Sequence, residues 1–557
     1  MEKIFSVINI KRAIPLLCLL AMAFAGCKKN FLDRESQGQY TQDNYPYPGG
    51  SGPYDTYLFA AYSQLRAYNV HSQFFICATT IRSDDADKGS TASDGGADAS
   101  NMDNFPVSKS SSYVNGLWTG YYGFVDKCNI AINQIHTNTS IVASQDIKIQ
   151  SEAEARFLRG YAYFMLVRMF GNIPLVDSVF TNTASQSNVP QSTPDKIYAL
   201  IESDLQYAAQ HLPASWDPKF IGRATSGAAN GLLAKVYLTE KKWAAAMGAA
   251  TAVMNSGQYD LSTPYTTIFG EAGENSKESV FEVQATATFS QKTAYGVQYA
   301  QIMGIRGSGV WNLGWGWCTP STDLYNAYEA NDPRRDRTIM VMSTSSAVPN
   351  KSIYGESFPL YNPAGSPPNP MYNGKVYTSP AIRAAVDNFG YWMNIRILRY
   401  ADVVLMYAEA ANEVGGAANI TAARNAVNSV RARARSGAVA GTLPDITTTD
   451  QAALRDIIRH ERRIELAMEH DRFFDIVRWG IAQSTLNAAG KTNFSDARDV
   501  LLPIPQAQID ISAGVLKQNP GYKSPTILIL NCYATYILAS MEKITSICCS
   551  AAFIQCL

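Results

Sequence analysis

Apolar side chains recur at three- and four-residue spacing through much of the chain, the pattern of helices that bury one face. One such helix is expected over residues 152–170, and Gly171 and Pro174 mark its end. Its apolar positions are Phe157, Leu158, Tyr161, Phe164, Met165 and Met169. A second helix is expected to begin with Thr193 as N-cap and Pro194 in its first turn. The chain is therefore predicted to be mainly α.

Two further helices are predicted at 226–239 and 243–255, and the turn between them is so short that they form a hairpin the length of a tetratricopeptide unit. Similar pairs are expected at 57–68 with 113–136 and at 397–414 with 419–435. Such units cannot bury their apolar faces alone, so they stack on one another. The predicted fold is a tetratricopeptide-like helix-pair scaffold.

Residues 258–392 lack this period and are rich in Gly, Pro, Ser, Asn and aromatic residues. We expect long loops and short strands laid over the helices there, and loops of this length usually carry function. This insert is the expected ligand-binding face. Its candidate ligand-binding residues are Tyr295, Tyr299, Arg306, Trp311, Asn312, Trp315 and Trp317.

The three tryptophans of this segment suit a sugar, whose rings offer apolar C–H faces that stack on aromatic planes. Arg306 and Asn312 could bind the sugar hydroxyls. Trp315 and Trp317 are two positions apart, so in an extended segment both indoles point to one side and form a flat shelf. The alternative is that these rings pack the loop against the helices.

The N-terminus has basic residues followed by an apolar run, 13–25, that has the length of a signal h-region and is too short to span a bilayer. The sequence Ala25-Gly26-Cys27 comes at its end and resembles a lipobox. We therefore predict a lipoprotein signal peptide at 1–26, lipidation of Cys27, and a polar tether through residue 56. The alternative is an ordinary secretory signal that ends at a cysteine.

Several classes of function lack their sequence signals. The formal net charge is +0, which disfavours a nucleic-acid partner. His460-Glu461 opens like a zinc-protease helix, but Ile464 stands where the second histidine is needed. We expect no catalytic residue, no enzyme activity, no bound metal and no cofactor. Cys77, Cys128 and Cys318 are expected to be buried as small hydrophobic residues.

An acidic, Gly/Ser-rich segment runs from Ser83 to Asp103. Its carboxylates are dense enough to hold Ca²⁺, although the order of an EF-hand is missing. A solvated loop is the alternative.

Five motifs stand in order along the chain: EARFLR at 154–159, LRYADVVLMYAEA at 398–410, ERRIEL at 461–466, LPIP at 502–505 and QNPGY at 518–522. Together these motifs resemble the SusD/RagB family over residues 27–522. Their charged residues are predicted to form partly buried ion pairs that fix how helices dock. Residues 523–557 follow the last motif, are hydrophobic and atypical, and are expected to be a non-native extension.

The resemblance implies a single SusD-like domain at 57–522, with four helix pairs beneath an irregular ligand-binding face. It implies a cell-surface lipoprotein of the outer membrane, facing the exterior, that binds a nutrient, expected to be a glycan, and delivers it to a TonB-dependent SusC-like transporter. It adds Arg82, Asp84 and Asn101 as candidate ligand-binding residues, because the segment after the family's first helix often contributes polar groups. The alternative is a surface-anchored scaffold for protein interactions that binds no glycan directly.

Overall fold

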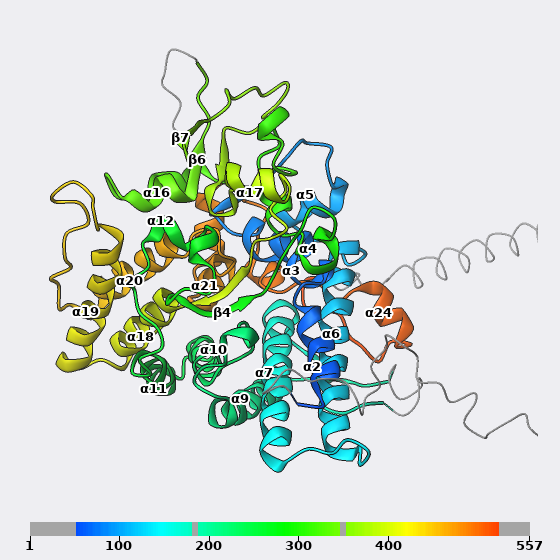
Figure 1. Ribbon diagram of the computed structural model, residues 1–557. Helices are drawn as coiled ribbons and strands as arrows, with labels where there is room; N and C mark the ends of the chain where they lie inside the picture. The colour runs from blue at the N-terminus through cyan, green and yellow to red at the C-terminus, as the bar shows by residue number, and fades with distance from the viewer. Residues whose placement is uncertain (1–51, 181–187, 346–351, 523–557) are drawn as a thin grey trace, which may run out of the picture.

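The computed structural model describes residues 52–180, 188–345 and 352–522. The predicted signal peptide, Cys27, most of the tether, and the tail 523–557 lie outside these ranges. Figure 1 shows helices along the lower half of the view and a loop-rich part, in green, above them. The predicted mainly α fold with an irregular face is confirmed.

The long helices form the scaffold. They are α2 (Asp55–Gln64), α6 (Ser112–Thr137), α7 (Gln145–Phe170), α9 (Pro194–His211), α10 (Ser226–Thr239), α11 (Trp243–Met254), α18 (Tyr400–Val414), α19 (Ala417–Ala434) and α20 (Gln451–Glu465). In the hairpins α6 packs on α7, α10 on α11 and α18 on α19, and α2 packs on α6. The helix pairs predicted from periodicity are therefore present.

The ends of these helices follow local chemistry. α7 begins seven residues before its predicted start because the Ser144 side chain accepts a hydrogen bond from the Ile147 N–H, and it ends at Gly171, whose φ is +70°. Thr193 takes the N-cap position of α9 as predicted, but its side chain makes no capping hydrogen bond. The predicted helix at 397–414 starts later, at Tyr400, because the residues before it form a strand.

The strands are short and antiparallel, and they pair two by two. The pairs are β1 (Ala86–Gly89) with β5 (Trp317–Pro320), β2 (Ile173–Pro174) with β3 (Gln191–Ser192), β4 (Ser279–Val283) with β10 (Ile395–Arg399), β6 (Ile339–Val341) with β9 (Met371–Asn373), and β7 (Ser352–Ile353) with β8 (Glu356–Ser357). The β4–β10 pair contacts α10 and α18 and joins the scaffold to the loop-rich part.

Short helices complete the chain. Near the N-terminus they are α3 (Tyr68–His71), α4 (Gln73–Ile76), the π-helical turn η1 (Cys77–Ile81) and α5 (Gly96–Asn104). In the loop-rich part they are α12 (Tyr265–Ile268), α13 (Lys292–Tyr295), α14 (Ala300–Met303), α15 (Thr322–Ala327), α16 (Pro333–Thr338) and α17 (Pro380–Ala385). The C-terminal ones are α21 (Arg472–Arg478), α22 (Ala482–Ala488), α23 (Asp496–Asp499) and α24 (Gln506–Ile511).

The main hydrophobic core runs through the scaffold and takes in residues of the loop-rich part as well. Cys77, Cys128 and Cys318 are fully buried, as predicted, and burial raises the pKa of each thiol. Within the described ranges, no helix is both long and apolar enough to cross a bilayer.

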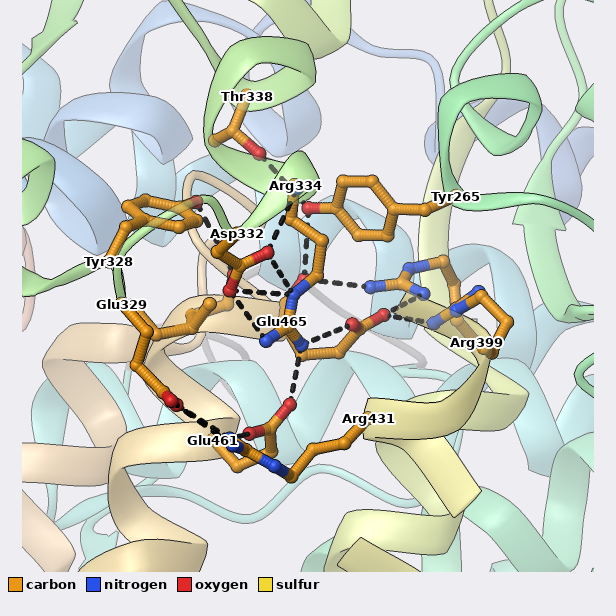
Figure 2. A network of polar contacts seen from close by, with 12 residues as sticks. Tyr265, Tyr328, Glu329, Asp332, Arg334, Thr338, Arg399, Arg431, Glu461 and Glu465 are labelled. Carbon is orange, nitrogen blue, oxygen red and sulfur yellow. Dashed lines mark hydrogen bonds and ion pairs between the residues drawn. The ribbon is translucent and has the colours of Figure 1, made fainter. Parts of the chain in front are cut away.

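A buried network of ion pairs ties α20 to the loop-rich part and to α19 (Figure 2). Its centre is Glu465, whose carboxylate lies 3.1 Å from Arg334 Nη1, 3.1 Å from Arg399 Nη1 and 2.5 Å from Arg433 Nη2. One turn earlier, Glu461 pairs with Arg334 and with Arg431, at 2.5 and 3.1 Å. These side chains come from separate elements, so the network fixes how the elements dock.

The charges in this network stabilise one another. Burial alone would raise the pKa of Glu465, but Arg433, Arg399 and Arg334 outweigh it and hold that pKa far below its usual range. Burial alone would lower the pKa of Arg334, and its carboxylate neighbours raise it instead. The prediction that the charged motif residues form buried ion pairs is therefore confirmed. Arg399, placed on a helix by the sequence, instead ends strand β10.

Candidate functional site

Two segments that the sequence singled out separately lie side by side. The acidic segment after the first helices contains β1, and the tryptophan-rich loop runs into β5. The two strands pair with Ala86 opposite Pro320 and Gly89 opposite Trp317. The candidate residues near 82–101 and near 306–317 therefore belong to one region of the fold.

Polar side chains cross-link these segments beyond the strand pair. Ser90 Oγ lies 2.6 Å from an Asp94 carboxylate oxygen and 2.7 Å from the Trp315 carbonyl oxygen. Arg306 donates to Ser90 Oγ at 2.7 Å and forms an ion pair with Asp94. Asn369 Nδ2 donates to the Ser90 carbonyl oxygen at 3.2 Å. Ser90 thus links the Trp315 backbone to Asp94, Arg306 and Asn369.

Asp94 is ionised in this arrangement. Its partial burial favours the protonated form, but hydrogen bonds from Ser90 and Thr91 and the positive charge of Arg306 outweigh that effect and lower the pKa of Asp94 to about 2. The ion pair with Arg306 therefore persists across the neutral and mildly acidic range.

The prediction that Trp315 and Trp317 form an aromatic shelf is wrong for Trp317. Trp317 is only 4% exposed, because its indole packs into the core beside Gly95 and beneath the Lys88 ammonium, which lies 5.0 Å from the ring centroid. Trp311 is also buried, against Phe358. For these two rings the alternative of packing against the fold is the one observed. Trp315 is half-buried and remains partly open to solvent.

The other candidates of this loop also divide into buried and exposed residues. Tyr299 is buried, and its hydroxyl lies 2.7 Å from His470 Nε2. Tyr295 is 51% exposed and lines a hollow of about 440 Å³ with Phe59 of α2. Asn312 is exposed, and its backbone pairs with that of Arg306 in an isolated antiparallel β-bridge. Tyr295, Arg306, Asn312 and Trp315 are therefore the members of the set that reach the surface.

The candidates of the first segment use their polar groups mainly inside the protein. Arg82 is buried over the Phe473 ring and donates to the Asp499 carbonyl oxygen. Asp84 is buried and accepts two hydrogen bonds from Arg472, each 2.8 Å long. Asn101 is half-buried on α5. Of these three, only Asn101 leaves a side chain partly open to solvent.

Four carboxylates of the acidic segment, those of Asp84, Asp85, Asp94 and Asp103, form ion pairs with protein cations. Asp84 and Asp85 pair with Arg463, at 2.9 and 2.7 Å, and Asp103 pairs with Lys491 at 2.6 Å. Within the ranges that the structure covers, no group of three or more His, Cys, Asp or Glu side chains is arranged to hold a metal ion. The ion pairs of Asp84, Asp85 and Asp103 therefore join residues 84–103 to residues 463–491.

Sequence reasoning missed three residues of this region. Lys88 sits over Trp317, Ser90 bonds both Asp94 and Trp315, and Asn369 joins the group from 279 positions away. Lys88 and Ser90 could have been noted because they stand inside the acidic segment. No local pattern marks Asn369, since its role depends on a distant contact.

Comparisons with known proteins agree on one family. A family model described as the SusD family matches residues 277–522, and a second, described as starch-binding associating with outer membrane, matches residues 61–238. SusD-like protein P2 of Formosa agariphila is 30% identical over 482 residues, which cover 83% of this chain and 91% of that protein. A SusD-like protein of Bacteroides ovatus is 29% identical over 504 residues, covering 85% and 83%.

Solved structures with the same fold include proteins described as binding glycans. A laminarin binding SusD-like protein superposes with a TM-score of 0.70 at 25% identity, covering 84% of this chain and 99% of that one. Surface glycan-binding protein A from Bacteroides thetaiotaomicron, in complex with laminarihexaose, gives 0.67 at 25% identity, covering 84% and 98%.

Proposed function

The chain belongs to the SusD/RagB family, and from this premise we propose that it binds a glycan at the cell surface and delivers it to a TonB-dependent SusC-like transporter in the outer membrane. It acts by binding and not by catalysis. Proteins of the same fold that are described as binding glycans, among them a laminarin binding SusD-like protein, support this proposal.

The observation that carries the proposal is the meeting of the two candidate segments at β1 and β5. Near that pair lies a half-buried indole, Trp315, whose backbone shares Ser90 as a hydrogen-bond partner with the Arg306 guanidinium, and the backbone of exposed Asn312 bridges to that of Arg306. An aromatic plane with a few fixed polar groups matches a sugar ring, which is apolar on its faces and hydroxylated at its edge. The cross-links from Ser90 and Asp94 hold these groups in place before a ligand arrives, which lowers the ordering entropy of binding.

A screen of the detergent-solubilised protein against neutral polysaccharides, acidic polysaccharides and peptides is expected to give micromolar binding to one class of polysaccharide. Calorimetry would measure the affinity, and pull-down from solubilised outer membranes is expected to recover a TonB-dependent transporter. Binding of peptides with no polysaccharide would contradict glycan capture and favour the scaffold function.

Cys27 is proposed as the membrane anchor. Cells grown with labelled palmitate are expected to label the protein, and Cys27→Ala is expected to remove the label and release the protein from the membrane, since two or more acyl chains are needed for durable anchoring. Cys18→Ala, which changes a cysteine of the signal peptide, serves as the matched control and should keep the label. Label that persists in Cys27→Ala would contradict the assignment.

A further inference from the structure

A second hollow lies in the loop-rich part, away from the β1–β5 pair. Its volume is about 570 Å³. It is lined by residues of α12, the 3₁₀ turn Glu271–Gly273, α16 and the β7–β8 hairpin, and by residues between Tyr377 and Trp392. Figure 1 shows α12, α16 and β7 together at the upper left, whereas α5, which contacts β1, lies at the upper right. The lining residues that matter are Arg337, Tyr354, Tyr377 and Trp392.

Two buried hydrogen-bond donors of this lining have no acceptor within the part of the chain that the structure describes. Arg337 is 6% exposed, and it donates from Nε to the Thr266 carbonyl oxygen at 3.1 Å and from Nη1 to the Gly374 carbonyl oxygen. Its Nη2 has no partner among the described residues, and neither has Nε1 of Trp392. Buried donors without acceptors are uncommon because each carries a desolvation penalty. Two of them on one hollow indicate a place for an acceptor-rich ligand.

The charge on Arg337 is also unmatched. Arg334, one turn earlier on α16, is paired with Asp332, Glu461 and Glu465. The ion pairs of the described residues include none for Arg337. Burial lowers the pKa of Arg337 to about 10, so the side chain is still a cation at neutral pH. A buried cation without a carboxylate favours an anion as the missing partner.

The rim of the hollow suits a sugar ring. Tyr354 is 55% exposed and stacks on Tyr377, with ring centroids 5.9 Å apart and an interplanar angle of 13°. An exposed ring held by a second ring is a platform for the apolar face of a sugar. Glu271 and Asp336 also line the hollow, but both are exposed, so water and salt screen them more than they screen buried Arg337.

We propose that this hollow binds an anionic group of the glycan, a carboxylate or a sulfate, with Arg337 supplying the charge, Trp392 an N–H donor and Tyr354 a stacking surface. The inference rests on the proposed function and narrows the ligand to an acidic polysaccharide. The anionic group then occupies a site separate from Trp315.

The test compares charged and neutralised forms of the same sugar backbone with the full-length protein. Oligogalacturonate and its methyl ester probe a carboxylate, and sulfated galactan oligosaccharides and their desulfated forms probe a sulfate. One charged form is expected to bind at least about tenfold more tightly than its neutral counterpart, because hydrogen bonds to charged groups are the stronger ones. The pair that shows the difference identifies the anionic group.

Three variants assign the effect to the hollow. Arg337→Gln is expected to abolish the preference for the charged form, and Tyr354→Ala to weaken binding of both forms without disturbing the fold, since that ring is exposed. Arg335→Gln removes the same charge from α16 outside the lining and should leave the preference intact. Arg337→Lys, which keeps the charge, should restore part of the preference if Arg337→Gln folds poorly.

The outcomes separate the two proposals. Equal binding of charged and neutral forms, or equal effects of Arg337→Gln and Arg335→Gln, would overturn the anionic site. Binding of neutral glycans alone would overturn it while the proposed function stands. Failure to bind any glycan would overturn both.

Discussion

Glu465→Gln is expected to lower the free energy of unfolding by about 3–5 kcal/mol. The substitution keeps the size of the side chain but removes the negative charge on which Arg334, Arg399 and Arg433 converge. All of these groups are almost fully buried, so water cannot replace the lost carboxylate. Denaturant unfolding followed by circular dichroism would measure the change.

Glu413→Gln is the matched control for this variant. Glu413 pairs with Arg455 at 2.5 Å, but both side chains are partly exposed. Surface pairs contribute about 0–1 kcal/mol, so this control should unfold close to the wild type. A loss for Glu465→Gln that is no larger than for Glu413→Gln would contradict the structural role of the network.

The difference between wild type and Glu465→Gln should depend on pH. The folded-state pKa of Glu465 is lowered by its arginine neighbours, although burial opposes them. A carboxylate of this kind adds stability that is fully present above its unfolded pKa of about 4.3 and is lost as the pH falls below that value. The two proteins should therefore differ most at neutral pH and converge as the pH drops from about 5 toward the acid limit.

Trp315→Ala is expected to weaken binding of the glycan found in the screen roughly 30-fold, which corresponds to about 2 kcal/mol. Trp315 is the aromatic residue of the predicted set that remains partly open beside Arg306 and Asn312 at the β1–β5 pair. Removing the indole takes away the stacking surface while the cross-link through the Trp315 backbone carbonyl is kept. Calorimetry would measure the affinity, with circular dichroism as the folding control.

Trp317→Ala should behave differently from Trp315→Ala. The Trp317 indole is buried in the core, so truncation should lower stability by about 3–5 kcal/mol through the cavity it leaves. A Trp315→Ala protein that is folded and binds with wild-type affinity would show that the glycan binds elsewhere. A Trp317→Ala protein with unchanged stability would contradict the packing described for that ring.

The helix pairs could be predicted from the sequence because their signal is local. Residues 226–239 carry an apolar period of their own, and the helix has the predicted bounds, with Thr225 as its N-cap. The residues before Tyr400 also carry apolar side chains, but they form a strand because β4, more than a hundred positions earlier, pairs with them. Periodicity in one segment does not reveal such a partner.

The candidate site was predictable in part because composition, like helical periodicity, is a local signal. Composition identified the tryptophan-rich loop and the acidic segment as unusual, and both contribute to the region around β1 and β5. The burial of each ring depends on how the loop folds back. The start of α5 and Lys88 cover the Trp317 ring, whereas Trp315 stays half-buried. The hollow beside Arg337 lies within the predicted insert 258–392, but its position could not be predicted, since its lining comes from segments spread between Thr266 and Trp392.

The contacts that build the β1–β5 region also determine when it can form. Ser90 and Trp315 are 225 positions apart, and Asp84 bonds Arg472 across 388 positions. Contacts of such long range carry a loop-closure entropy that is offset only when the intervening chain has packed, so they form late in folding. The proposed glycan site at the β1–β5 pair is therefore expected to be absent from a partly folded chain and to appear only when the helix scaffold is complete.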